Sequence, residues 1–186
     1  MSLATENIET LLVLCQKGNQ LAQVEIYNRY NQAMYNTSLR IVKNTAEAED
    51  IMQESFITAF DKLHTYKGDA AFGSWLKRIV INNSISQYRK SQRFVKMPDN
   101  YGEDYQEDAI LEESGENDFS QLKVKQVMRC MDDLNDNYKN VLNLHFVEGY
   151  DYEELCDILK ISYSNCRTLI SRAKESLRKK LVLSYG

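Results

Sequence analysis

The sequence has little proline, little glycine and no long hydrophobic run. Its 186 residues include one proline, Pro98, and seven glycines. Because both residue types interrupt regular structure, their scarcity favours long helices over a turn-rich β fold. No apolar run approaches the roughly 20 residues of a membrane-spanning helix, and the N-terminus has no basic secretory segment. We therefore expect an all-α, cytoplasmic chain that does not insert into a membrane.

The sequence also lacks the common motifs of catalytic and metal sites. It contains no glycine-rich phosphate loop, no Gly-x-Ser-x-Gly and no Cys-x-x-Cys, and its two histidines supply no pair of Glu-x-x-His motifs. The cysteines stand far apart at apolar helical positions, which favours small buried thiols over disulfides or zinc ligands: Cys15, Cys130, Cys156 and Cys166. We therefore predict no catalytic residue, no metal and no cofactor.

Acidic residues are concentrated in one segment. The formal net charge is −4, yet residues 98–121 contain nine Asp and Glu and no Lys or Arg. Residues 1–97 and 122–186 are each net positive, by three and two charges. Low hydrophobicity with unbalanced charge is typical of flexible segments. We therefore expect two small helical domains, 1–97 and 122–186, joined by an acidic linker at 98–121.

Apolar residues recur at helical spacing through the first domain. The pattern predicts helices over about 8–16, 21–42, 45–64 and 70–96. Thr45 is the expected N-cap of the third helix. The acidic and polar face of that helix carries Asp50, Gln53 and Glu54, which as a pattern fits either a solvated face or a protein-docking face.

Aromatic and cationic residues lie together between Thr65 and Lys96. Aromatic rings can stack on unpaired bases while Lys and Arg follow the phosphates, so this stretch suits strand-separated DNA. Phe72 and Trp75 share their spacing with Ile79, which makes them more readily core residues. The remaining candidates are Tyr66 and Lys67 in a predicted loop and Tyr88, Arg89, Lys90 and Arg93 on the following helix.

The second domain predicts four short helices, of which the last two form a helix-turn-helix. Asp151 to Glu154 has capping-box spacing, and after a turn at 160–162 a longer polar helix runs to about Leu181. In a DNA-binding helix-turn-helix this second helix enters the major groove. Its outward positions hold side chains that hydrogen-bond bases and phosphates: Ser164, Asn165, Arg167, Thr168, Ser171 and Arg172. An ordinary helical hairpin with a solvated basic face fits the same pattern.

Four stretches, in order, resemble the extracytoplasmic-function (ECF) type of bacterial RNA polymerase sigma factor. Residues 46–56 (AEAEDIMQESF) are similar to the family's A-E-D-I-x-Q-E-x-F helix, and the pattern from Phe72 to Asn82, with Arg89-Lys90 behind it, is similar to its next helix. Residues 148–155 and 161–178 are similar to the approach and the recognition helix of its second region. The resemblance implies a subunit that binds core RNA polymerase, recognises promoter DNA and promotes strand separation, and that catalyses nothing itself.

The resemblance also implies a role for each site. Asp50, Gln53 and Glu54 would contact the clamp helices of the polymerase β′ subunit, and the β flap would be a further contact. Residues 65–96 would open and read the single-stranded minus-ten element through Tyr66, Lys67, Asn82, Arg89, Lys90 and Arg93. Residues 163–175 would read the duplex minus-thirty-five element through the six outward residues named above. Whether an anti-sigma factor also binds the chain stays open.

Two other functions fit the residues alone. A helix-turn-helix regulator that binds duplex DNA without polymerase would give Asp50, Gln53 and Glu54 no role. A helical metal-dependent hydrolase would use the carboxylates between Glu47 and Glu54.

Overall fold

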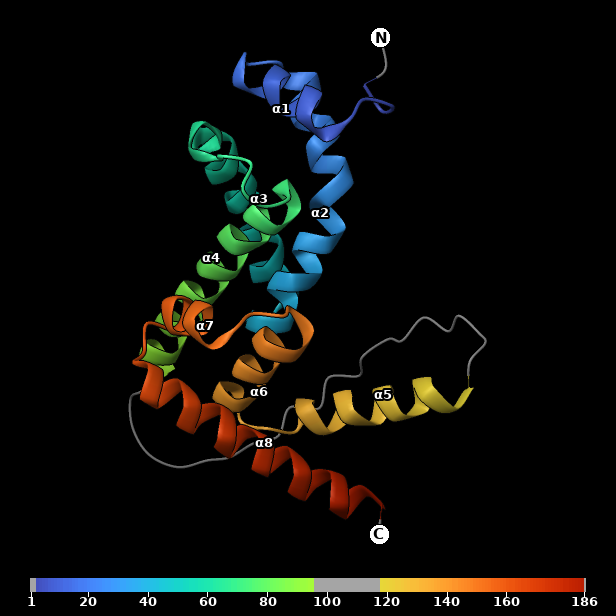
Figure 1. Cartoon of the computed structure of the whole chain (residues 1–186), viewed down its shortest axis with the longest axis vertical. Coiled ribbons are helices and arrows are strands. Elements are labelled where there is room, and N and C mark those ends of the chain that lie inside the picture. The colour runs from blue at the N-terminus through green and yellow to red at the C-terminus, as the bar shows by residue number, and fades with distance from the viewer. Residues whose placement is uncertain (1–2, 96–117, 186) are drawn as a thin grey trace. The chain divides into compact units, whose positions relative to one another are not determined.

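A computed structural model of the chain describes residues 3–95 and 118–185, and every regular element in these ranges is helical (Figure 1). The chain divides into two compact units, Met1–Val95 and Lys96–Gly186. The predicted all-α fold is confirmed for this part of the chain. Of the expected linker, residues 98–117 lie outside the described residues, whereas residues 118–121 already form the first turn of a helix.

Unit 1 contains four α-helices and one short 3₁₀ helix. They are α1 (Ile8–Gln16), α2 (Gln20–Val42), α3 (Thr45–Asp61), the 3₁₀ helix η1 (Leu63–Thr65) and α4 (Phe72–Val95). Helices α2, α3 and α4 pack against one another in pairs, and α1 packs on α2 and η1. The four helices predicted from the periodicity are present, and the bundle leaves one face of α3 and one face of α4 at the surface.

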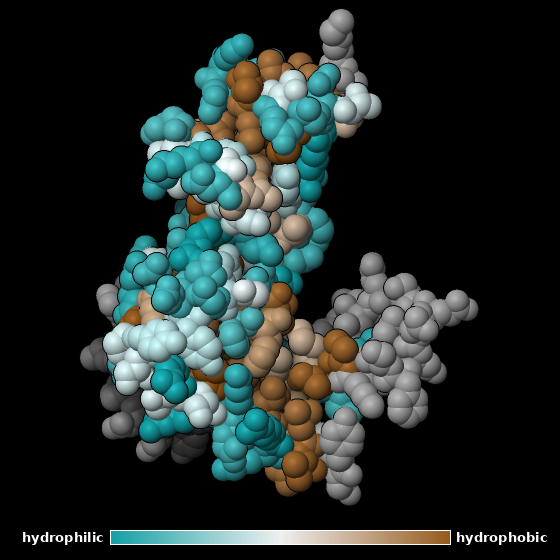
Figure 2. Space-filling model, viewed as in Figure 1, coloured by the Kyte–Doolittle hydropathy of each residue, from teal (hydrophilic) through white to brown (hydrophobic). Residues whose placement is uncertain are grey.

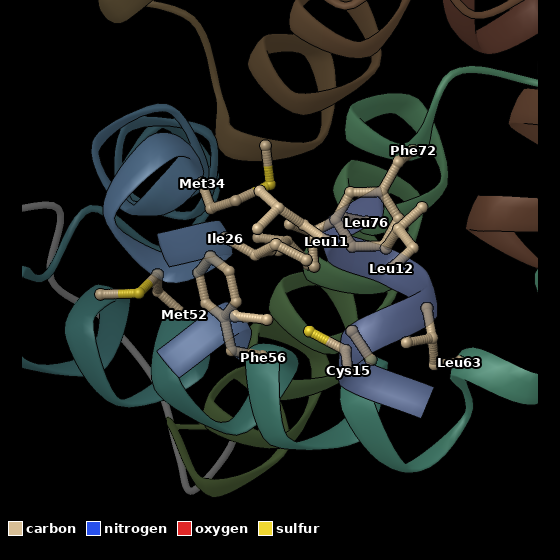
Figure 3. Close-up of a cluster of buried hydrophobic side chains, with 13 residues drawn as sticks. Leu11, Leu12, Cys15, Ile26, Met34, Met52, Phe56, Leu63, Phe72 and Leu76 are labelled. Atoms are coloured by element: carbon tan, nitrogen blue, oxygen red, sulfur yellow. The ribbon is translucent and has the colours of Figure 1, made fainter. Parts of the chain in front are cut away.

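The core of unit 1 is built from the apolar stripes of all four helices. Figure 3 shows Leu11, Ile26, Phe56 and Leu76 pointing toward one another from α1, α2, α3 and α4. The rings of Tyr27 and Phe56 lie 4.9 Å apart between centroids. Burying a Leu, Ile or Phe side chain contributes about 1.5–3 kcal/mol, so these contacts hold α3 and α4 in fixed orientations.

Asparagine side chains cap the first three helices. The side-chain oxygens of Asn7, Asn19 and Asn44 accept hydrogen bonds from backbone N–H groups in the first turns of α1, α2 and α3. The prediction that Thr45 caps α3 was wrong, because α3 already includes Thr45. Asn44 is the last extended residue before the helix, at φ −126° and ψ 125°. Its side-chain oxygen accepts a hydrogen bond from the N–H of Glu47 at 2.9 Å.

Unit 2 is a second helical bundle assembled around its last helix. It contains α5 (Asp118–Asp132), α6 (Asp136–Leu142), the π-helical turn η2 (Asn143–Val147), α7 (Tyr152–Leu159) and α8 (Tyr163–Tyr185). Helix α8 packs against α5, α6 and α7, and Leu142, Leu155 and Ile170 are fully buried between them. The four predicted helices of this region are present, and α7 and α8 form the expected helix-turn-helix.

Candidate nucleic-acid and protein interfaces

Helix α7 is held at both ends by local backbone and side-chain bonds. The Asp151 carboxylate accepts the N–H of Glu154 at 2.8 Å, and the Glu154 carboxylate accepts the N–H of Asp151 at 3.0 Å, which completes the predicted capping box. At the other end Lys160 has a left-handed backbone, at φ 49° and ψ 47°, and its N–H donates to the carbonyl of Cys156. This residue turns the chain directly into α8, so the spacing of the two helices is fixed by a short turn.

Helix α8 separates a buried face from an exposed polar one. Cys166, Ile170 and Ala173 are at most 1% exposed and face the unit's core. All six side chains predicted to read duplex DNA are exposed on the other face: Ser164, Asn165, Arg167, Thr168, Ser171 and Arg172. Five of them, all except Asn165, line one open depression along the helix. The fold therefore gathers the predicted residues on one accessible surface, while their contacts with bases stay a prediction.

Tyr163 is a member of this surface that the sequence analysis did not select. It is the first residue of α8, its side chain is 53% exposed, and it lines the same depression as Ser164 and Arg167. Its ring lies 6.0 Å from the ring of Tyr152 on α7. Its place at the N-terminus of the second helix was the available signal, because that end approaches base edges in this motif.

Cations farther along α8 have protein partners. The Lys174 ammonium lies 5.2 Å from the centre of the Phe146 ring, a cation–π distance. Glu175 lies 3.9 Å from Arg178 and 3.8 Å from Lys179. Such exposed pairs contribute little to stability, so Arg178 and Lys179 remain available for phosphate contact. Figure 2 shows the helix ending in hydrophobic surface, where Val182 and Leu183 are exposed.

In unit 1, α3 presents an acidic and polar face around one exposed hydrophobic side chain. Asp50, Gln53 and Glu54 are all exposed, as predicted from the helical pattern. Ile57, which is 63% exposed, follows them at the i+7, i+4 and i+3 positions and so lies on the same face. A single exposed isoleucine is common on protein surfaces, so this face fits a solvated face as well as a protein-docking face.

Ile57 was missed by the sequence analysis. The signal was its position outside the stripe of buried residues, since Met52, Phe56 and Ala59 face the core and Ile57 does not. The Gln53 side chain is held by a hydrogen bond within the helix, since its amide donates to the Glu49 carboxylate at 3.3 Å.

The loop between η1 and α4 is organised by aromatic packing. The Tyr66 ring lies 5.7 Å from Phe72 and 5.4 Å from Trp75, and its hydroxyl donates to the carbonyl of Ala70 at 2.7 Å. Phe72 is 3% exposed, which confirms the core interpretation for it, and Trp75 is half-buried against the same core. Tyr66 is therefore held in one orientation, while Lys67 beside it is exposed.

Polar bonds orient α4 relative to its neighbours. The Asn83 amide donates to Ser55 on α3, and the Ser84 hydroxyl donates to Ser38 on α2, each at 3.0 Å. Asn82, one residue earlier, is exposed and lies on the outward face, as does Lys90 two turns later. Arg89 is half-buried, and the side chain of Arg93 lies outside the described residues.

Within residues 3–95 and 118–185, no three His, Cys, Asp or Glu side chains come together in a way that could hold a metal ion. Nor does any described helix have the length and hydropathy of a membrane span.

Family models match both units. A model described as Sigma-70 region 2 matches residues 26–94, and one described as Sigma-70, region 4 matches residues 125–177. The first match includes α3 and α4, and the second includes the helix-turn-helix.

Relatives match along most of the chain, and a solved structure has a similar fold. The ECF RNA polymerase sigma factor SigW of Bacillus subtilis is 30% identical over 185 residues, covering 89% of this chain and 92% of SigW. SigM, an ECF RNA polymerase sigma factor of the same organism, is 28% identical over 155 residues, covering 83% of this chain and 91% of SigM. The fold is similar to that of the sigma factor RpoE in its complex with the anti-sigma factor NepR from Bartonella quintana. The TM-score is 0.58 at 22% identity, over 84% of this chain and 94% of RpoE.

Proposed function

Because this chain belongs to the ECF RNA polymerase sigma factors, we propose that it binds core RNA polymerase and selects promoters through three surfaces. The α3 face of Asp50, Gln53, Glu54 and Ile57 binds the polymerase clamp helices. The outward side of the 66–71 loop and α4 binds the strand-separated minus-ten element. The exposed face of α8 reads the duplex minus-thirty-five element. The chain supplies binding free energy for an open promoter, and the polymerase supplies the chemistry.

The exposed face of α8 is the observation that carries this proposal. A capping box and a left-handed turn fix α7 against α8, so six side chains able to bind bases and phosphates face solvent on one helix. Arg167 and Arg172 can each bind guanine through two hydrogen bonds, and Ser164 and Thr168 can bind bases or phosphates. Tyr163 lines one open depression together with Ser164, Arg167 and Arg172.

The surfaces of unit 1 fit the other two tasks. Lys67 on the loop and Asn82 and Lys90 on α4 offer exposed donors, and the half-buried Trp75 lies in the first turn of α4. Unpaired bases stack on aromatic rings, and cationic side chains bind the phosphates of the single strand. The acidic α3 face carries charge of the opposite sign, which suits protein docking and repels DNA.

Transcription in vitro tests the proposal directly. We expect core polymerase loaded with this chain to form open complexes on promoters from the genome that encodes it, detected by permanganate reactivity of unpaired thymines. Core polymerase alone is the control. Failure to form open complexes on any promoter bound by the chain would contradict the proposal.

An anti-sigma factor is a further partner that we propose for this chain. The support is its fold, which is similar to that of a sigma factor solved with such a partner. Co-purification of the full-length chain with the product of a gene adjacent to its own tests this, with the Asp50→Lys/Glu54→Lys variant as a comparison. The cytoplasmic location predicted from the sequence stays a prediction.

A further inference from the structure

A row of aromatic rings crosses unit 2 and ends at the exposed face of α8. The rings of Phe146 and His145 on η2 lie 4.9 Å apart between centroids, and that of His145 lies 5.3 Å from Tyr152 on α7. The Tyr152 ring lies 6.0 Å from the ring of Tyr163, the first residue of α8. Rings at about 4.5–7 Å attract one another. Tyr163 therefore packs on the end of this row and lines the depression of the α8 face.

The two middle rings of the row belong to segments that hydrogen bonds hold in place. Nδ1 of His145 lies 2.9 Å from the carbonyl oxygen of Tyr150, and because a carbonyl only accepts, Nδ1 carries the proton and donates it. Tyr152 directly follows Asp151, whose capping box begins α7. The Tyr163 ring thus packs on a fixed neighbour, which lowers the conformational freedom that it would lose on binding a ligand.

Tyr163 gives the depression an aromatic surface. Its side chain is 53% exposed, although its ring packs on Tyr152. The other residues that line the depression offer hydroxyl or guanidinium groups: Ser164, Arg167, Thr168, Ser171 and Arg172. In a helix-turn-helix the first residues of the second helix approach base edges in the major groove. An exposed ring therefore lies at the end of α8 that comes nearest to the bases.

Thymine is the base that presents a methyl group in the major groove. Its C5-methyl is apolar, whereas the other base edges there present hydrogen-bond donors and acceptors. Apolar side chains contact this methyl, and covering it removes apolar surface from water. A serine hydroxyl or an arginine guanidinium recognises bases through hydrogen bonds instead. The exposed ring of Tyr163 is therefore suited to thymine in a way that Ser164 and Arg167 are not.

We propose that Tyr163 reads a thymine of the minus-thirty-five element through contact between its ring and the thymine methyl group. This contact rests on the proposed function of α8, and it adds a specificity-determining residue and the base that this residue prefers. Arg167 follows Tyr163 at the i+4 position and lies on the same side of the helix. The thymine is therefore expected next to the bases that Arg167 contacts.

Replacing thymine by deoxyuridine removes only the methyl group and so tests the contact directly. A promoter duplex is first selected from a random library by core polymerase loaded with the full-length chain. Each thymine of its minus-thirty-five element is then changed to deoxyuridine in turn, and competition binding gives the relative affinities. We expect binding to fall about fourfold at one position, the effect of one covered methyl group. Tyr163→Ala should bind the two duplexes of that position alike, whereas Tyr163→Phe should keep the difference.

A merely structural role of Tyr163 gives a different result, because its loss would weaken binding to both duplexes equally. The control is Val182→Ala, which changes an exposed apolar residue near the other end of α8 and should keep the difference.

Several results would overturn the proposal. The parent chain could bind every deoxyuridine duplex as tightly as the thymine duplex, or Tyr163→Ala could retain the difference. Loss of the difference in Tyr163→Phe would assign it to the hydroxyl instead of the ring. Loss in Thr168→Ser but not in Tyr163→Ala would assign the methyl contact to Thr168. If the loaded polymerase selects no duplex, the proposed function fails, and the Tyr163 contact fails with it.

Discussion

The side chain of Asn83 on α4 donates a 3.0 Å hydrogen bond to the hydroxyl of Ser55 on α3. Ser55 is fully buried and in turn donates to the carbonyl of Ile51 at 2.6 Å. The bond links the helix that carries Asp50 and Glu54 to the helix that carries Asn82. A partly buried polar contact therefore joins the helix of the proposed polymerase surface to the helix of the proposed minus-ten surface.

Removing this contact should destabilise unit 1. Ser55→Ala leaves the Asn83 amide without its partner, and we expect the free energy of unfolding to fall by roughly 1–2 kcal/mol. Urea unfolding followed by circular dichroism measures the change. The control is Ser86→Ala, which changes an exposed serine on α4, the helix of Asn83. It should change the free energy of unfolding by less than about 0.5 kcal/mol. Equal effects of the two variants would show that the Asn83–Ser55 bond contributes nothing.

Reversing the charge of the α3 face should abolish polymerase binding without unfolding the chain. Asp50 and Glu54 are exposed, so Asp50→Lys/Glu54→Lys changes the surface and leaves the core intact. We expect loss of co-elution with core polymerase and an unchanged thermal transition. Glu6→Lys, an exposed acid outside α3, is the matched control and should still bind. Retained binding of core polymerase by the double variant would show that Asp50 and Glu54 lie outside the docking surface.

Shortening the exposed isoleucine on α3 should weaken the same complex. Ile57→Ala removes apolar area that the partner would cover, and we expect a loss of roughly 1–2 kcal/mol in affinity for core polymerase. Val24→Ala is the control, because Val24 on α2 is 54% exposed, compared with 63% for Ile57. Titration of labelled chain with polymerase measures both. If both variants bind like the parent, Ile57 lies outside the interface.

Two cations on α8 should affect promoter binding in different ways. Arg167→Ala removes a contact with a base, which should cost about 1–3 kcal/mol and relax the preference at one position of the minus-thirty-five element. Lys179→Ala removes a phosphate contact, so we expect weaker binding to every sequence and a smaller salt dependence. Competition binding against a library of single-base promoter variants distinguishes the two patterns. A uniform effect of Arg167→Ala would remove it from base readout.

The capping box should stabilise α7 against local unfolding. Asp151→Ala deletes the acceptor of the Glu154 N–H, so we expect a loss of about 1 kcal/mol in local stability. Hydrogen exchange of the α7 backbone amides reports this loss. Glu153→Ala serves as the control, because Glu153 is acidic and exposed in the same turn but is not part of the capping box. Similar exchange rates in the two variants would contradict a capping role.

Local patterns in the sequence were sufficient for the helices and for the outward faces of α3 and α8. The reason is that helical periodicity places residues on a face without reference to any other element. Asp50, Gln53 and Glu54 and the six side chains of α8 are exposed because the apolar residues between them, such as Met52 and Ile170, must be buried. The capping box at Asp151 is local as well, since its two hydrogen bonds join residues three positions apart.

Contacts between elements were decided only by the tertiary structure. Helical spacing does not say which side chains of two elements meet. Only the packed structure shows that Asn83 on α4 bonds to Ser55 on α3 and that the Tyr66 ring lies against Trp75. Periodicity determines which face of a helix turns inward, and the packing of one helix on another determines what that face contacts.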